Sequence, residues 1–188
     1  MITSAARAAE HEKYTRCYQQ SNYRMGANRM RDAVRILEAL PSRGSYLDVG
    51  TGRGEMLSFA MFHGFNPVKG AEVVASLLDF PRVIRAEGHD LPFADGGFHT
   101  VTMFDVIEHL LPGDDELVCR ELARVACNHI IVAANNCQSK NKAGDVLHVN
   151  IRPYAEWDSL FREWFAPHHV MWVTNASSFS QIWRVDLT

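Results

Sequence analysis

The order of apolar and polar positions along the chain predicts strands and helices that follow one another. Four runs rich in apolar and β-branched residues, over 45–49, 67–73, 82–86 and 98–106, are typical of strands. A fifth run, 130–134, is continuously apolar, as expected of a strand buried on both faces. Helical spacing of apolar residues separates these runs. Strands joined by helices imply right-handed crossovers and therefore a parallel sheet.

The predicted helices differ in how clearly their apolar faces are marked. Residues 1–24 are polar and predict a helix with only a thin apolar face, whereas 30–40 has clear helical spacing. A short buried helix face follows over 56–61, and Gly64 is its expected C-terminal stop. A later helix begins after Pro112 with acids that suit the helix dipole. Its predicted apolar stripe consists of Leu117, Val118, Leu122 and Val125.

The pattern changes after the fifth strand. A long polar connection covers 135–150, and an amphipathic, aromatic-rich helix follows over 154–165, with Pro153 at its first turn. Two β-like runs, 169–174 and 181–187, close the chain. We expect them to form an antiparallel hairpin at the edge of the sheet.

Length and composition fit one folded domain. A chain of 188 residues can bury one substantial core. We expect an N-terminal helical lid at 1–43, a cofactor-binding core at 45–135, and a substrate loop, helix and terminal hairpin at 136–188. No stretch has the features of a signal peptide or a membrane span. The four cysteines have no metal-ligand spacing and are typical of reduced thiols, so we expect a soluble cytoplasmic protein.

Charge is distributed unevenly along the chain. The net charge of −3 argues against general affinity for nucleic acid. Residues 1–43 nevertheless carry eight cationic and four acidic side chains, a net charge of +4, which leaves −7 for the remainder. Either an exposed helical face packed on an acidic domain or a patch for a phosphate-bearing substrate explains this asymmetry.

The stretch 47–55, Leu-Asp-Val-Gly-Thr-Gly-Arg-Gly-Glu, is the densest candidate for chemistry. It predicts a strand, a tight turn with glycine at alternate positions, and the start of a helix. Glycine lets the backbone approach a ligand closely, and helix N–H groups can hold an anion. Asp48 ends the strand, where open α/β sheets bind ligands. The spacing fits the dinucleotide fingerprint poorly, and the absence of Gly-Lys-Ser/Thr excludes a P-loop.

Polar residues follow three later strands at the same predicted edge. Glu72 ends the second strand, 18 residues after Gly54, where a carboxylate can accept both hydroxyls of a ribose. Asp90, beside the apolar Leu91, follows the third strand and could bind an adenine amino group. The segment 104–110, Phe-Asp-Val-Ile-Glu-His-Leu, ends the fourth. Each feature alone is also explained as a solvated strand end, a turn or a helix cap, but their coincidence favours a site.

Residues 45–135 together resemble the core of the class I methyltransferases that use S-adenosylmethionine. The segment 104–110 is characteristic of the branch that methylates small molecules, lipids and sugars. The resemblance implies an α/β, Rossmann-like, doubly wound sheet of seven mostly parallel strands, with the last strand antiparallel. It also implies that S-adenosylmethionine is the methyl donor and S-adenosylhomocysteine the product.

The resemblance implies roles for individual residues. The glycine loop would line the methionine moiety, the acid after the second strand the ribose, and residues 90–91 the adenine, while the end of the fourth strand would form the floor beneath the sulfonium. Arg24, in the lid with Tyr23 and Arg29, is a candidate partner of the methionine carboxylate, although surface charge explains these cations equally well. The predicted cofactor residues are Asp48, Gly50, Thr51, Gly52, Glu72, Asp90, Leu91, Phe104, Asp105 and Arg24.

Methyl transfer from a sulfonium needs alignment, desolvation and, for a hydroxyl or ammonium acceptor, a base. His109 is one candidate base and His148 is the other. His148, Asn150 and Arg152 alternate with apolar residues and would share one side of an extended segment. That side would lie near the mouth of the site if the 135–150 connection folds over the site. A connection this long is more often functional than not. A surface strand with one polar face explains the same pattern.

Missing motifs separate the alternatives. The fourth strand does not end in the Asn/Asp-Pro-Pro-aromatic motif of DNA amino-methyltransferases, and no cysteine follows a proline as in cytosine-C5 enzymes. The sequence offers no convincing ligand set for the metal-dependent catechol type. We therefore expect methyl transfer to oxygen or nitrogen of a small-molecule or glycan-like acceptor. A nucleic-acid-modifying enzyme that uses the basic N-terminal segment, a non-catalytic cofactor-binding module and an NAD(P)-binding protein are the alternatives.

Overall fold

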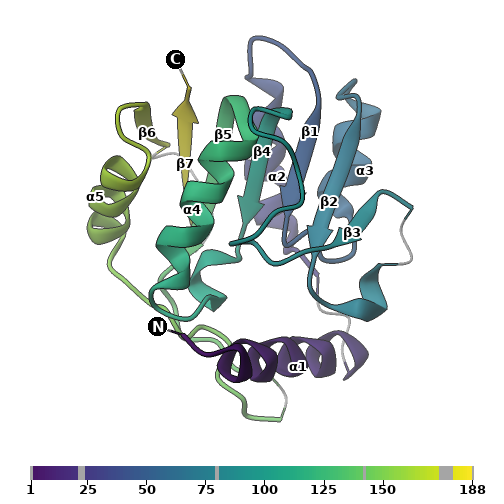
Figure 1. The fold of residues 1–188 in the computed structure, drawn as a ribbon, viewed down its shortest axis with the longest axis vertical. Helices are drawn as coiled ribbons and strands as arrows, with labels where there is room; N and C mark the ends of the chain where they lie inside the picture. Colours follow the sequence, from purple (N-terminus) through teal and green to yellow (C-terminus); the bar gives the residue numbers. More distant parts are fainter. Residues whose placement is uncertain (1, 21–23, 79–80, 142, 174–179, 188) are drawn as a thin grey trace.

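A seven-stranded sheet carries helices on both faces (Figure 1). The computed structural model describes residues 2–20, 24–78, 81–141, 143–173 and 180–187. The strands are β1 (Tyr46–Val49), β2 (Val68–Glu72), β3 (Val83–Arg85), β4 (Phe98–Phe104), β5 (Ala126–Asn135), β6 (His169–Val173) and β7 (Ser180–Asp186). The helices are α1 (Ser4–Gln20), α2 (Ala27–Glu38), α3 (Glu55–Phe62), α4 (Asp114–Val125) and α5 (Tyr154–Trp164), with 3₁₀ turns η1 (Ala75–Leu77) and η2 (Ile107–His109).

The strand order is β3-β2-β1-β4-β5-β7-β6. The first five strands in this order run parallel, and β7 pairs antiparallel with both β5 and β6. The predicted doubly wound, mostly parallel sheet with an antiparallel last strand and a terminal hairpin is thus confirmed. The order reverses between β1 and β4. At such a switch point the loops that follow the two strands diverge and leave a crevice for a ligand.

Side-chain alternation along β5 divides the interior into two cores. Ile130, Val132 and Ala134 face the core formed with α4 and α5, whereas Ile131 and Ala133 face the core formed with α2 and α3. Successive side chains of a strand point to opposite faces of the sheet, so a strand covered by helices on both sides must be apolar throughout. The prediction of a strand buried on both faces is confirmed.

The apolar stripe of α4 is narrower than predicted. Val118, Leu122 and Val125 are at most 1% exposed, but Leu117 is 45% exposed. Consecutive helical residues are turned by about 100°, so Leu117 lies to one side of the face that its three neighbours share. Its assignment to the stripe is wrong.

The strand β4 ends two residues earlier than predicted. Asp105 has a φ of 56°, in the left-handed region that an extended strand excludes. The chain turns there and enters η2. This turn brings the residues after β4 to the same edge of the sheet as the glycine loop after β1.

The N-terminal segment contains two helices with different positions. Helix α2 packs on the sheet through Ala33 and Leu37, whereas α1 lies across the carboxyl ends of the parallel strands (Figure 1). Arg7 of α1 donates two hydrogen bonds to Asp114, of 2.8 and 2.5 Å. Tyr23, which we expected in the lid, falls outside the described residues. Among the residues that the structure describes, no helix is long and apolar enough to cross a membrane.

Candidate functional site

Two cavities adjoin at the carboxyl ends of β1, β2 and β4. The first is walled by side chains of α1, the end of β2 and the segment after β3. The second lies between the glycine loop and the start of α2. Tyr18, Gly50 and Asp105 line both. The two cavities therefore meet at the switch point between β1 and β4.

The glycine loop after β1 has a backbone that other residues rarely adopt. Gly50, Gly52 and Gly54 have φ values of 72°, 54° and 79°. A Cβ on Gly50 would lie 2.4 Å from a Val106 methyl group, and one on Gly52 would lie 2.8 Å from the Tyr18 hydroxyl. Both conformation and space thus require glycine at these two positions. The buried Thr51 lines the second cavity between them.

Glu72 ties the glycine loop to the end of β2. Its buried carboxylate accepts hydrogen bonds from the N–H groups of Gly52 at 2.8 Å, Val73 at 2.9 Å and Val74 at 3.0 Å. The same side chain lines the first cavity. Its ribose-binding role remains a prediction.

Asp48 is a buried carboxyl at the floor of the second cavity, near Phe104. Burial raises its pKa to about 7, and the Thr102 hydroxyl, which donates to it at 2.6 Å, opposes this shift. The negative charges of Glu72 and Glu55 raise the pKa further. Asp48 therefore takes up or releases its proton near neutral pH, and its burial and these neighbouring groups set where this happens.

Asp105 projects at the junction of the two cavities. Arg29 pairs with its carboxylate at 2.8 Å, and the Ser180 hydroxyl donates to it at 2.7 Å. Burial raises the pKa of Asp105, and the Arg29 charge counteracts this. Arg24 is exposed and lines the second cavity close to this pair.

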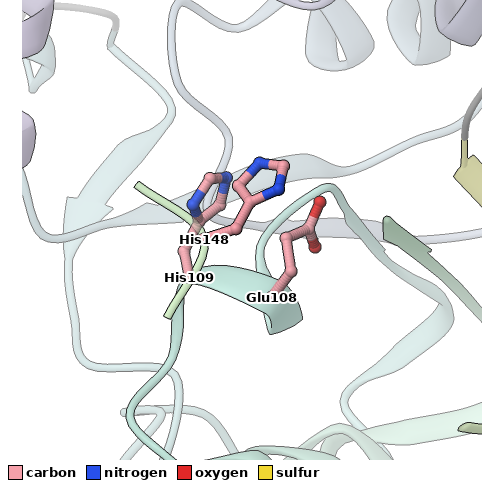
Figure 2. Close-up of side chains that lie close together, drawn as sticks. All are labelled: Glu108, His109 and His148. Carbon is pink, nitrogen blue, oxygen red and sulfur yellow. The ribbon is translucent and has the colours of Figure 1, made fainter. Parts of the chain in front are cut away.

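The two histidines proposed as bases lie together after β4, although 39 positions separate them in the sequence. Their ring centroids are 4.7 Å apart, and the Glu108 carboxyl lies beside them (Figure 2). His109 lines the first cavity, whereas His148 lines neither. Burial lowers the pKa of His109 to about 3, so this ring is neutral at pH 7. Burial also lowers the pKa of His148.

Comparison with known proteins identifies the family. Residues 20–184 match the family described as "Methyltransferase domain". The chain belongs to this methyltransferase family. No curated protein matches the sequence.

Solved structures share the fold of this methyltransferase. The 1,6-didemethyltoxoflavin-N1-methyltransferase of Burkholderia thailandensis, with bound 1,6-didemethyltoxoflavin and S-adenosylhomocysteine, has a TM-score of 0.77 and 17% identity over 100% of this chain and 92% of that one. The PH0226 protein of Pyrococcus horikoshii OT3 has a TM-score of 0.70 and 16% identity, over 94% and 99%. Magnesium protoporphyrin IX methyltransferase of Synechocystis PCC 6803, with bound S-adenosylmethionine, has a TM-score of 0.67 and 11% identity, over 100% and 99%.

These likenesses show the fold, and the family match shows the class of protein. Together they confirm the predictions of a class I methyltransferase and of S-adenosylmethionine as its methyl donor.

The residues predicted to bind adenine lie away from the cavities of the methyltransferase. Asp90 is exposed, and Leu91 is 3% exposed in the core, where its N–H donates to Glu121 at 2.9 Å. Neither lines a cavity; Glu87 and His89, just before them, line the first one instead. The loop was found from the sequence, but the orientation of its individual side chains was not.

Helix α1 supplies cavity residues that we did not predict. Arg7, His11, Tyr14 and Tyr18 all line the first cavity. Their spacing of four, three and four positions puts them on one helix face. This polar and aromatic periodicity is the signal that could have identified them, and it also explains why the apolar face of α1 is thin.

Proposed function

We propose that this methyltransferase transfers the methyl group of S-adenosylmethionine to oxygen or nitrogen of a small-molecule or glycan-like acceptor. The meeting of two different cavities at Gly50 and Asp105 supports this proposal. One end of the first cavity, lined by Val73 and Val74 together with Glu72, suits adenosine. The second has the glycine loop and Arg24, which suit the charged amino-acid end of the cofactor. The sulfonium then lies at the junction of the cavities.

The acceptor would enter beside Asp105 and His109, under α1. This other end of the first cavity is walled by Tyr14 of α1, which contacts His109, and this cover favours a small acceptor over a long polymer. The Burkholderia thailandensis enzyme of the same fold was solved with a small heterocyclic compound, which agrees with this choice. A sulfonium is already a strong electrophile, so holding the acceptor in line supplies most of the catalysis.

His109 is the better placed of the two candidate bases because it lines the cavity and His148 does not. Its buried ring is neutral at physiological pH and can therefore accept a hydrogen bond from an acceptor hydroxyl or ammonium group, but a pKa of about 3 makes it a weak base. We propose that His109 orients the acceptor group in the metal-free protein.

A radiolabelled methyl donor tests the proposal against a panel of acceptors. The panel contains small hydroxylated and amino compounds, oligosaccharides, and short RNA and DNA. We expect label on a small acceptor or a glycan. Asp105→Ala should lose transfer, whereas Glu163→Ala, the control at an exposed position, should lose less. Labelling of nucleic acid alone, with steep dependence on salt, would instead support a nucleic-acid-modifying enzyme. Cofactor binding without any transfer would support a binding module.

A further inference from the structure

We propose that Glu108, His109 and His148 form a binding site for one divalent transition-metal ion beside the first cavity. One ligand atom of each side chain lies within 4.8 Å of those of the other two (Figure 2). Two imidazoles and a carboxylate form a donor set that zinc and related ions accept, whereas magnesium prefers oxygen ligands. Metal–ligand bonds of about 2.1 Å place tetrahedral ligand atoms roughly 3.4 Å apart. Binding therefore needs side-chain shifts of about an ångström.

The hydrogen bonds of the two histidines leave one nitrogen of each ring with a lone pair for a metal. Nδ1 of His148 lies 2.5 Å from the Cys137 carbonyl oxygen, which can only accept, so Nδ1 carries the proton. The Tyr14 hydroxyl donates to the Leu147 carbonyl oxygen at 2.7 Å, so Nδ1 of His109 donates to the Tyr14 oxygen at 2.5 Å. Both Nε2 atoms then keep their lone pairs. Histidine ligands of metals are generally fixed in this way through their other nitrogen.

Glu108 is a fully buried carboxyl whose charge is not compensated. Within the described part of the chain, neither of its oxygens has a hydrogen-bond partner of acceptable geometry. The cation of Arg29 is paired with Asp105 at 2.8 Å. A buried carboxylate is costly unless a cation or donors balance it, and a metal ion would balance it here.

Hydrogen bonds hold the long connection before α5 against η2, and this contact places His148 beside Glu108 and His109. The N–H groups of Val149 and Asn150 both donate to the Glu108 carbonyl oxygen at 3.0 Å. Lys13 of α1 donates to the Val146 carbonyl oxygen at 2.8 Å. These bonds hold the residues on both sides of His148, so the three ligands come from two segments already docked on each other.

A bound ion would have open coordination positions, and His109 connects the cluster to the first cavity. An acceptor hydroxyl on such a position would lose its proton more easily. This use of the ion rests on the proposed function, but the binding of the ion does not. The two therefore need separate measurements.

Metal titration of untagged, chelator-treated protein tests the site. We expect one Zn²⁺ or Co²⁺ per chain by calorimetry, visible d–d absorption for Co²⁺, and much weaker binding of Mg²⁺. Glu108→Gln and His148→Asn should each weaken Co²⁺ binding at least about tenfold. His169→Asn is the matched control, because this histidine is exposed on β6, the outer strand that β5 and β7 separate from β4, and the variant should bind as wild type.

Two melting-temperature measurements separate the loss of metal binding from a loss of folding and from a loss of cofactor binding. Glu108→Gln removes a buried acid, so the metal-free variant should melt at or above the wild-type temperature, which separates lost ligation from lost folding. No stoichiometric binding to wild type, or equal binding to Glu108→Gln, would overturn the metal site. A shift of the melting temperature with S-adenosylhomocysteine in the same metal-free wild type would show that cofactor binding stands even when the metal site fails.

Discussion

At the scale of single residues, Asp48 links protonation to stability. Its pKa is about 7 in the folded protein, against 3.8 ordinarily. Between about pH 4 and pH 7 the folded state keeps a proton that the unfolded state has released, so stability falls as pH rises through this interval. Asp48→Asn removes this dependence. The variant should therefore gain stability relative to wild type as the pH rises. The difference in free energy of unfolding, variant minus wild type, should be larger at pH 8 than at pH 4.5 by up to a few kcal/mol.

Urea unfolding at both pH values measures this difference. Glu55 and Glu72, whose charges act on Asp48, are present in both proteins, so the comparison isolates the Asp48 side chain. The same difference between variant and wild type at both pH values would contradict the assignment of a raised pKa to Asp48.

Gly50 and Gly64 separate conformational strain from crowding. Both have positive φ, 72° and 86°, but a Cβ on Gly64 meets nothing within 4 Å, whereas one on Gly50 collides with Val106. Gly64→Ala should cost roughly 1–2 kcal/mol of stability and leave cofactor binding intact. Gly50→Ala should cost more and weaken S-adenosylhomocysteine binding at least about tenfold. Calorimetric titration with S-adenosylhomocysteine measures the affinity of both variants. Equal affinities of Gly50→Ala and Gly64→Ala would refute the role of Gly50.

Some site residues were predictable because their local chemistry is restrictive. Gly50 and Gly52 occupy backbone positions that strongly favour glycine, and Glu72 ends a strand beside them. Asp90 was not predictable in the same way, because β3 has only three residues and the loop after it has no periodicity that fixes which side chain faces inward. The contact of His109 with His148 depends on how a long irregular connection folds back.

At the scale of elements, helix α4 offers a paired test of packing. Leu122 is fully buried and Leu117 is 45% exposed on the same helix. Leu122→Ala should lower the free energy of unfolding by about 2–5 kcal/mol, because it removes core contacts and leaves a cavity. Leu117→Ala should change it by less than about 0.5 kcal/mol. Chemical denaturation measures both, and similar losses would contradict the orientation of α4.

Elements with strong periodicity were predicted well, and their ends were not. The apolar run in β5 identifies a strand, but pairing with β4 and β7 extends it to Ala126–Asn135 through polar residues that the pattern alone excludes. The left-handed Asp105 ends β4 early. Strand ends are set by partners distant in the sequence, which hydropathy does not reveal.

At the scale of the whole molecule, the basic N-terminal segment is used internally. Arg7 pairs with Asp114 at the start of α4, and Arg29 pairs with Asp105 after β4. Of the two explanations for the charge asymmetry, these contacts favour helices packed on an acidic domain. They also fix α1 and the start of α2 around the two cavities.

The sheet order explains why distant motifs form one site. The sequence of strands predicted a parallel sheet, and the reversal between β1 and β4 then brings the glycine loop and the residues after β4 together. The pattern predicted an N-terminal helical lid at 1–43, but not which side chains of α1 line the site. Helix α1 has few apolar residues, so its place across the site depends on polar contacts such as those of Arg7 and Tyr14.

The most direct test of the central claim is the melting temperature with and without S-adenosylhomocysteine, in wild type, Glu72→Ala and the exposed control Glu163→Ala. At about 100 times its dissociation constant the ligand should add about 2.7 kcal/mol, or roughly 5–10 °C. We expect this shift in wild type and in Glu163→Ala, and none in folded Glu72→Ala. No shift in wild type, or an equal shift in Glu72→Ala, would contradict a methyl-donor site at the junction of β1 and β4.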